Sequence, residues 1–167
     1  MKVTHVWKAA TVAAVAAAAL ALGIQAAAGP PWGPETPPFN VQAILSDVTG
    51  GSGFGHVKFR QPNDADKIVY LGTWVRGLLP SHDYLLQRAI DTTLDGNCTS
   101  TAWLTLGKGL APQAITTDAR GTGRELLFRD LAAIPTGTQF DIHFRLVDAA
   151  TGAPVLASGC YRFTVSQ

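Results

Sequence analysis

From Phe39 onward, the chain consists of short segments in which apolar and polar residues alternate, with turn-forming residues between them roughly every ten positions. Alternation with a period of two places successive side chains on opposite faces of a β-strand. The run Phe-Asp-Ile-His-Phe-Arg-Leu-Val at 140–147 is the clearest example. Short strands at regular spacing are typical of an antiparallel sandwich or barrel. We therefore predict an all-β domain, a sandwich or barrel of about eight antiparallel strands.

Gly, Pro, Asn and Asp residues that favour turns bound the predicted strands. In 56–61, two apolar residues share one face and His56, Lys58 and Arg60 share the other. The segment 67–76 is apolar on both faces, which indicates a central strand or one covered by a loop. The predicted strands are residues 40–48, 56–61, 67–76, 84–90, 102–106, 125–130, 140–147 and 160–165, with 114–117 either a further strand or part of a loop.

The first 28 residues follow the plan of a secretory signal peptide. Lys2 and Lys8 accompany an apolar run from Ala9 to Ile24, and the small residues Ala26 and Ala28 fit the positions that a signal peptidase reads. An uncleaved membrane anchor is the alternative, but this alanine-rich run is short for a bilayer core of about 30 Å. We therefore expect residues 1–28 to be removed by cleavage after Ala28.

Cleavage at that point leaves a proline-rich leader at 29–38 and a single domain at 39–167. The chain has 13 basic and 12 acidic residues, so the loss of Lys2 and Lys8 changes its formal charge from +1 to −1. A nearly neutral domain gives no electrostatic reason to expect binding to nucleic acid or anionic lipid. We expect a protein that is secreted or located in the periplasm or cell envelope, with no membrane span after signal cleavage.

Cys98 and Cys160 are the only two cysteines of the chain. An exported chain with two cysteines in strand-rich sequence most simply forms one long-range disulfide. The alternative is a reactive or metal-binding thiol pair, but the spacing is not that of a redox Cys-x-x-Cys motif. We therefore predict a structural disulfide, which in the simple loop-entropy model stabilises the fold by roughly 4 kcal/mol.

Six segments carry a resemblance to known proteins: Gly-His-Val-Lys-Phe-Arg-Gln at 55–61, Val-Tyr-Leu-Gly-Thr-Trp-Val-Arg-Gly-Leu at 69–78, Gly-Asn-Cys-Thr-Ser at 96–100, Ile-Thr-Thr-Asp-Ala-Arg-Gly at 115–121, and the last two long segments at 140–148 and 157–165. In this chain order they resemble the copper–zinc superoxide dismutase family, and the chain is similar, too, to chordin-type (CHRD) sandwich domains. The resemblance implies a superoxide-dismutase-like Greek-key architecture, in which the cysteine-bearing loop is tied to the last strand.

The resemblance does not extend to the metal ligands. An enzyme of that family holds copper through four histidines and zinc through histidines and an aspartate, whereas the predicted domain contains only His56, His82 and His143. Leu-Leu-Gln-Arg at 85–88 replaces the family's His-x-His pair. We therefore expect no superoxide dismutase activity, no catalytic residues and no cofactor. The alternative is a copper- or zinc-binding protein outside the cytoplasm that uses His143, His56 and His82 with Asp141.

Two local clusters have simpler interpretations. Asp141 and His143 share a strand face, which we expect to be solvated, with Arg145 pairing with Asp141. The contiguous Ser-His-Asp at 81–83 follows a turn, whereas a catalytic triad is assembled from separate elements, so turn chemistry is favoured.

Arginines dominate the basic residues from the fourth predicted strand onward. Their plain explanation is pairing with Asp91, Glu125, Asp130 and Asp141, and the alternative is a recognition patch. We expect a non-catalytic protein with a binding or structural role, whose partner is a protein or a component of the cell envelope. The arginines are Arg88, Arg120, Arg124, Arg129, Arg145 and Arg162.

Overall fold

The computed structural model describes residues 40–62 and 66–166, and all regular secondary structure in this part of the chain is β-strand. The predicted signal peptide (1–28) and leader (29–38) lie outside the described residues. The strands are β1 (Asn40–Asp47), β2 (Phe54–Arg60), β3 (Ile68–Arg76), β4 (Asp83–Asp91), β5 (Leu104–Thr105), β6 (Gly107–Lys108), β7 (Ala111–Pro112), β8 (Ala114–Thr116), β9 (Gly123–Asp130), β10 (Gln139–Asp148), β11 (Pro154–Ser158) and β12 (Tyr161–Thr164).

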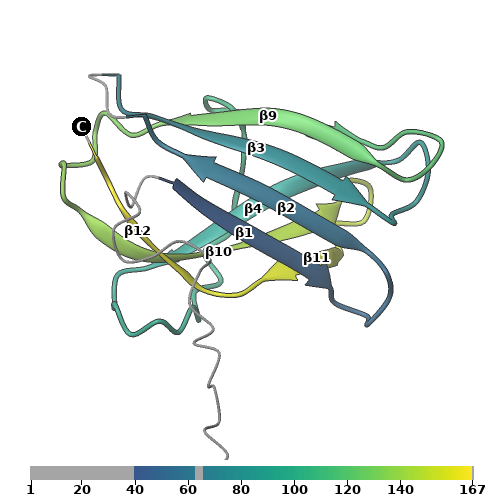
Figure 1. The fold of residues 1–167 in the computed structure, drawn as a ribbon, viewed down its shortest axis with the longest axis horizontal. Coiled ribbons are helices and arrows are strands. Elements are labelled where there is room, and N and C mark those ends of the chain that lie inside the picture. Colours follow the sequence, from purple (N-terminus) through teal and green to yellow (C-terminus); the bar gives the residue numbers. More distant parts are fainter. Residues whose placement is uncertain (1–39, 63–65, 167) are drawn as a thin grey trace, which may run out of the picture. The chain divides into compact units, whose positions relative to one another are not determined.

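The strands form one sheet that curls into a nearly closed barrel (Figure 1). Its strand order is β5-β4-β10-β11-β1-β2-β3-β9-β6-β7, and β12 also pairs with β10 and β8 with β4. β9 lies beside β3 although five strands separate them in the sequence, and β4 pairs with the late strand β10. Such long crossing connections between antiparallel strands are those of a Greek key. The predicted all-β class is confirmed.

One side of the barrel, between β4 and β9, is filled by the short strands at 104–116, and we call this side the seam. β5 and β8 pair with β4, while β6 pairs with β9. The backbone N–H of Leu106 donates to the carbonyl oxygen of Leu86 at 2.8 Å, and that of Gly109 donates to Phe128 at 3.1 Å. The seam is therefore bridged by single hydrogen bonds and two- or three-residue pairings rather than by one long strand.

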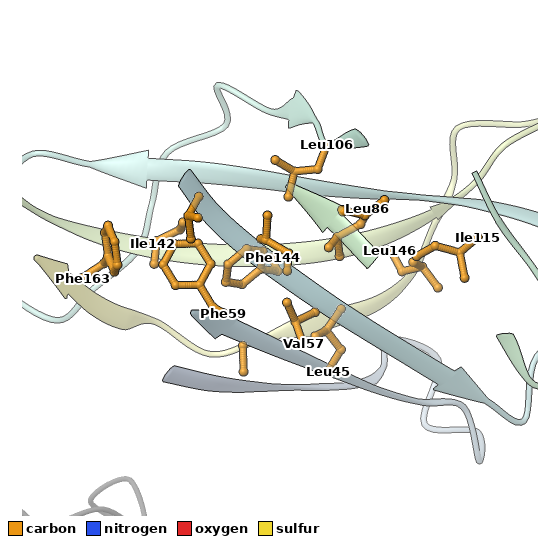
Figure 2. Packing of buried hydrophobic residues seen from close by; sticks show 14 of the residues in the cluster. Leu45, Val57, Phe59, Leu86, Leu106, Ile115, Ile142, Phe144, Leu146 and Phe163 are labelled. Atoms are coloured by element: carbon orange, nitrogen blue, oxygen red, sulfur yellow. The ribbon is translucent and has the colours of Figure 1, made fainter. Parts of the chain in front are cut away.

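Alternation in the long strands directs one face of each into a common core. Phe59 of β2 meets Phe163 of β12 with ring centroids 4.5 Å apart and Phe144 of β10 at 5.8 Å. Figure 2 shows these rings together, with Leu106 of the seam above Leu86 of β4. Burial of one such side chain contributes roughly 1.5 to 3 kcal/mol, so the opposed strands stabilise one another mainly by excluding water from this core.

Several elements differ from the predicted strands, and the two-residue strands β6 and β7 have no predicted counterpart. The strand predicted at 102–106 is reduced to β5, because the preceding residues form a loop that is fixed to other elements. β11 has no counterpart among the predicted strands either. It is only five residues long and begins with Pro154, a residue type that is depleted in strands. Proline is nevertheless tolerated as the first residue of a strand. Among the described residues, no helix is long and apolar enough to cross a membrane.

Candidate functional site

Cys98 and Cys160 form the predicted disulfide, with their Cα atoms 5.3 Å apart. Cys98 lies in the loop of residues 92–103 between β4 and β5, here called the cysteine loop, and Cys160 lies between β11 and β12. The described residues include no free cysteine. The bond fixes the cysteine loop to the half of the barrel formed by β4, β10 and β12.

Asp141 of β10 is fully buried, which corrects the prediction of a solvated face. Its carboxylate accepts hydrogen bonds from Nε and Nη2 of Arg162 at 3.0 and 3.3 Å, and from the backbone N–H of Gly96 at 2.7 Å. The bonds from Arg162 hold the pKa of Asp141 below its ordinary value, aided by Gly96 and opposed by burial. The predicted pairing with Arg145 is wrong, because Arg162 on the adjacent β12 occupies that carboxylate. Asp141 therefore fixes the cysteine loop a second time.

His143 also lies under the cysteine loop. Its ring centroid is 4.6 Å from that of Trp103, and its Nε2 donates to the carbonyl oxygen of Ser100 at 3.1 Å. Arg145 lies over Trp103 at 4.1 Å and donates through Nε to Gln87 at 2.7 Å. The outer face of β4 and β10 is thus covered by packed and hydrogen-bonded loop residues, which explains why Asp141 is buried and His143 and Arg145 are half-buried there.

His82 lies immediately before β4, and its Nε2 is 2.5 Å from Oδ2 of Asp148. The hydrogen bond from the backbone N–H of Thr151 has the largest effect on the pKa of Asp148 and that from His82 the second largest; together they lower this pKa to about 2. In the described chain, no Ser, Thr or Cys side chain bonds the other ring nitrogen of His82. The pair therefore joins the β3–β4 turn to the β10–β11 turn and does not form a nucleophile–base–acid series.

The three histidines of the predicted domain lie on separate elements with separate partners, since Nε2 of His56 on β2 contacts Oε1 of Gln42 at 3.0 Å. Within residues 40–62 and 66–166, no group of three His, Cys, Asp or Glu residues is placed to hold a metal ion. The set proposed for copper or zinc (His143, His56, His82 and Asp141) is therefore not brought together.

The expected pairing of the arginines with carboxylates is wrong for most of them. Arg162 is the one arginine that forms an ion pair in the described part of the chain. Glu125, one of the expected partners, instead pairs with Lys108 at 3.2 Å. Arg129 donates through Nη1 to the carbonyl oxygen of Gly109 at 3.2 Å. Most of the guanidinium groups are thus available for contacts other than internal ion pairs.

The outer face of the second half of the barrel is formed by β1, β2, β3 and β9, which lie side by side (Figure 1). The strand register aligns the outward side chains in rows; in one row, His56, Trp74 and Arg124 are neighbours. We call this surface the basic–aromatic face. Its residues are Phe54, His56, Lys58, Arg60, Tyr70, Gly72, Trp74, Arg76, Arg124 and Leu126.

The charge of the basic–aromatic face is one-sided. Lys58, Arg60 and Arg124 have no ion-pair partner among the described residues, and Asp130, opposite Ile68 at the end of β9, is the one acidic residue that these four strands direct outward. Glu125, which borders the face, is already paired with Lys108. Cations on neighbouring strands repel one another, so this arrangement disfavours the free protein slightly and favours an anionic partner.

Aromatic and aliphatic side chains lie between these cations. The guanidinium of Arg76 lies over the rings of Phe54 and Trp74, at 5.2 and 5.6 Å from their centroids. Gly72 has no side chain, and an added Cβ would meet nothing closer than Cβ of Lys58 at 3.9 Å. An open depression of about 540 Å³ lies over it, bounded in part by Trp74 and by Leu126, which is 57% exposed.

The sequence identifies one strand of this face, because the alternation at 56–61 places His56, Lys58 and Arg60 together. It does not identify the neighbours of that strand. Arg124 and Leu126 join the face only because the Greek-key connection brings β9 beside β3. Comparisons of the chain with protein-family models, curated proteins and solved structures find no match. A functional assignment therefore rests on the chemistry of these surfaces.

Proposed function

We propose that this protein is a non-catalytic binding domain that acts outside the cytoplasm and docks, through its basic–aromatic face, onto an acidic surface of a partner protein. The observation that carries the proposal is an exposed sheet face on which cations and aromatic rings lie together and Asp130, at the end of β9, is the one carboxylate. Protein interfaces are enriched in aromatic residues and arginine, and opposite charges guide the two partners into register.

The shape of the face supports a macromolecular partner. Small-molecule sites are concave and enclose most of their ligand, whereas the depression over Gly72 is open and lies on a sheet surface. The opposite half of the barrel is covered by the cysteine loop, which packs Trp103 on His143. An acidic protein surface would neutralise Lys58, Arg60 and Arg124, while Trp74 and Leu126 would lose contact with water.

The cellular location in the proposal rests on the predicted signal peptide and on the disulfide, a bond that persists in oxidising compartments. The Greek-key strand order and the Cys98–Cys160 bond are compatible with the superoxide-dismutase-like or CHRD-like resemblance. We retain that resemblance as a proposal about the relationship of the fold, separate from any enzymatic activity.

Binding of poly-L-glutamate, a model acidic polypeptide, tests the proposal by titration calorimetry at low and high salt. Arg124→Glu is expected to weaken binding roughly tenfold, because it reverses a cation of the face that lies directly beside Trp74. Arg120→Glu is the matched control, since it makes the same charge change in the exposed turn before β9 and should alter affinity less than twofold. Trp74→Ala is expected to weaken binding at both salt concentrations.

Equal losses for Arg124→Glu and Arg120→Glu would contradict the proposed surface. Tighter binding of the wild-type protein to heparin than to poly-L-glutamate would overturn the protein partner in favour of an anionic polysaccharide. Metal analysis of the purified protein tests the remaining part of the proposal, because a stoichiometric copper or zinc content would contradict a metal-free binding domain.

A further inference from the structure

Two arginines point toward the core at the seam of the barrel. Arg88 lies on β4 between the inward residues Leu86 and Ile90, and Arg129 lies on β9 two positions after the buried Leu127. Side chains two residues apart share a face of a strand, so both guanidinium groups face the space between β4 and β9. Both side chains are half-buried, and two like charges directed at one apolar space are unfavourable unless an anion pairs with them.

Neither arginine is paired with a carboxylate in the described part of the chain. Arg129 donates one hydrogen bond, to the carbonyl oxygen of Gly109, and Arg88 donates none to the described residues. A guanidinium has five N–H donors and stays charged in proteins, so most donors of these two half-buried groups are left for solvent or a ligand. Burial lowers the pKa of Arg88, and the positive charge of Arg129 lowers it further.

Both side chains line one cavity of about 50 Å³ at the seam. The rest of its lining is apolar and contains no acidic residue; it includes Leu106, Leu131, Ile134 and Phe140. A water-sized group occupies roughly 10 to 15 Å³ by this measure, so the cavity holds about three to five such groups. A carboxylate group with one or two further carbon atoms has this size.

We propose that this cavity binds a short-chain carboxylate of two or three carbon atoms, such as propionate. The carboxylate oxygens accept hydrogen bonds from Arg88 and Arg129, and the alkyl end contacts the apolar lining. Arginine favours this ligand chemistry, because its planar fork matches the two oxygens of a carboxylate. The ligand supplies the negative charge that the surrounding protein lacks, and the site is separate from the basic–aromatic face.

Titration of the purified protein with sodium propionate, in a buffer free of carboxylates and phosphate, tests the proposal by calorimetry and by thermal unfolding. We expect saturable 1:1 binding that raises the melting temperature, and an affinity at least tenfold higher than that for chloride. Arg88→Met and Arg129→Met are each expected to reduce the affinity at least tenfold. Arg120→Met, which removes an exposed arginine outside the cavity, should change it less than twofold.

The two methionine variants are expected to fold, and without propionate to be at least as stable as the wild-type protein, because each removes one of two like charges from an apolar site. Arg88→Lys provides a second test. It keeps the positive charge but replaces the planar guanidinium, which can bond both carboxylate oxygens, so it should weaken propionate binding severalfold. A wild-type protein that does not bind propionate would overturn the proposal and leave the inward charges as a device against strand addition at the seam. Equal affinity for propionate and chloride would also overturn it.

Discussion

Removal of the Cys98–Cys160 disulfide is expected to destabilise the protein by about 4 kcal/mol. The two cysteines are separated by 62 residues, and the loop-entropy relation gives about 4 kcal/mol at 25 °C for a loop of that length. The effect acts on the unfolded chain, because the bond limits the conformations available to the segment from β5 to β11. The double variant Cys98→Ala/Cys160→Ala removes the bond without leaving a free thiol.

The folded structure is expected to change little in this variant. Asp141 still accepts the hydrogen bond from Gly96, and Trp103 still packs on His143, so two contacts keep the cysteine loop in place. Urea unfolding measured by tryptophan fluorescence and by far-ultraviolet circular dichroism gives the free energy of unfolding. The near-ultraviolet signal of the folded variant should match that of the wild-type protein, because Trp103 keeps its surroundings.

A loss below about 1 kcal/mol would refute the reasoning, since it would mean that the unfolded chain gains almost no freedom when the bond is absent. A changed near-ultraviolet signal with a similar loss would show that the disulfide holds the folded loop itself. Wild-type protein reduced under native conditions is the control, and its stability should agree with that of the double variant.

Phe59→Ala should lower the free energy of unfolding by about 3 to 5 kcal/mol, because it empties the centre of the core between β2, β10 and β12; a loss no larger than that of Phe59→Leu would contradict this assignment. Asp141→Asn should cost about 2 kcal/mol in urea unfolding at neutral pH, since it removes the charge that Arg162 and Gly96 bond, and an unchanged midpoint would show that the buried carboxylate is dispensable. Asp148 has a folded pKa of about 2, below its ordinary value, so its stabilising effect is present above about pH 4 and is lost as the pH falls toward 2; the stabilities of wild type and Asp148→Asn should converge over that range, and a constant difference would argue against the assignment. Gly107→Ala should destabilise the seam by about 1 to 3 kcal/mol or more, because its Cβ would lie 1.8 Å from the carbonyl oxygen of Ala111, and normal hydrogen-exchange protection at 104–116 would contradict the close approach.

The strand pattern could be predicted from the sequence because alternation is a local property. The alternation of apolar and polar residues at 140–147 predicts which side chains are buried in the core. Phe140, Ile142 and Phe144 are buried as expected. The same pattern placed Asp141 and His143 on the opposite face, which is also correct. The error concerned what lies on that face, because coverage by the cysteine loop depends on a contact 45 residues away in the sequence.

The candidate sites were less predictable for the same reason. Nothing in the sequence distinguishes Arg88, at an inward position of β4, from the other arginines. Only the arrangement of the strands shows that Arg129 lines the same cavity as Arg88. The basic side chains of β2 were visible as an alternating set, but the cations of β9 belong to a different part of the chain. Local patterns determine the face of a strand, whereas strand order determines which faces act together.

The pairing of β1 with β11 has a consequence for how the chain reaches its native state. Leu45 pairs with Ser158, so the first strand acquires its second neighbour only when the last part of the chain has been made. The hairpins of β1, β2 and β3 are local and can form early, but closing so long a loop is entropically costly and slow. Until β11 arrives, the free edge of β1 can pair with any other strand it meets, including that of a second copy. Yield is therefore expected to depend on how quickly the C-terminal strands reach the folding chain, and truncation before Pro154 should produce aggregation rather than a smaller stable domain.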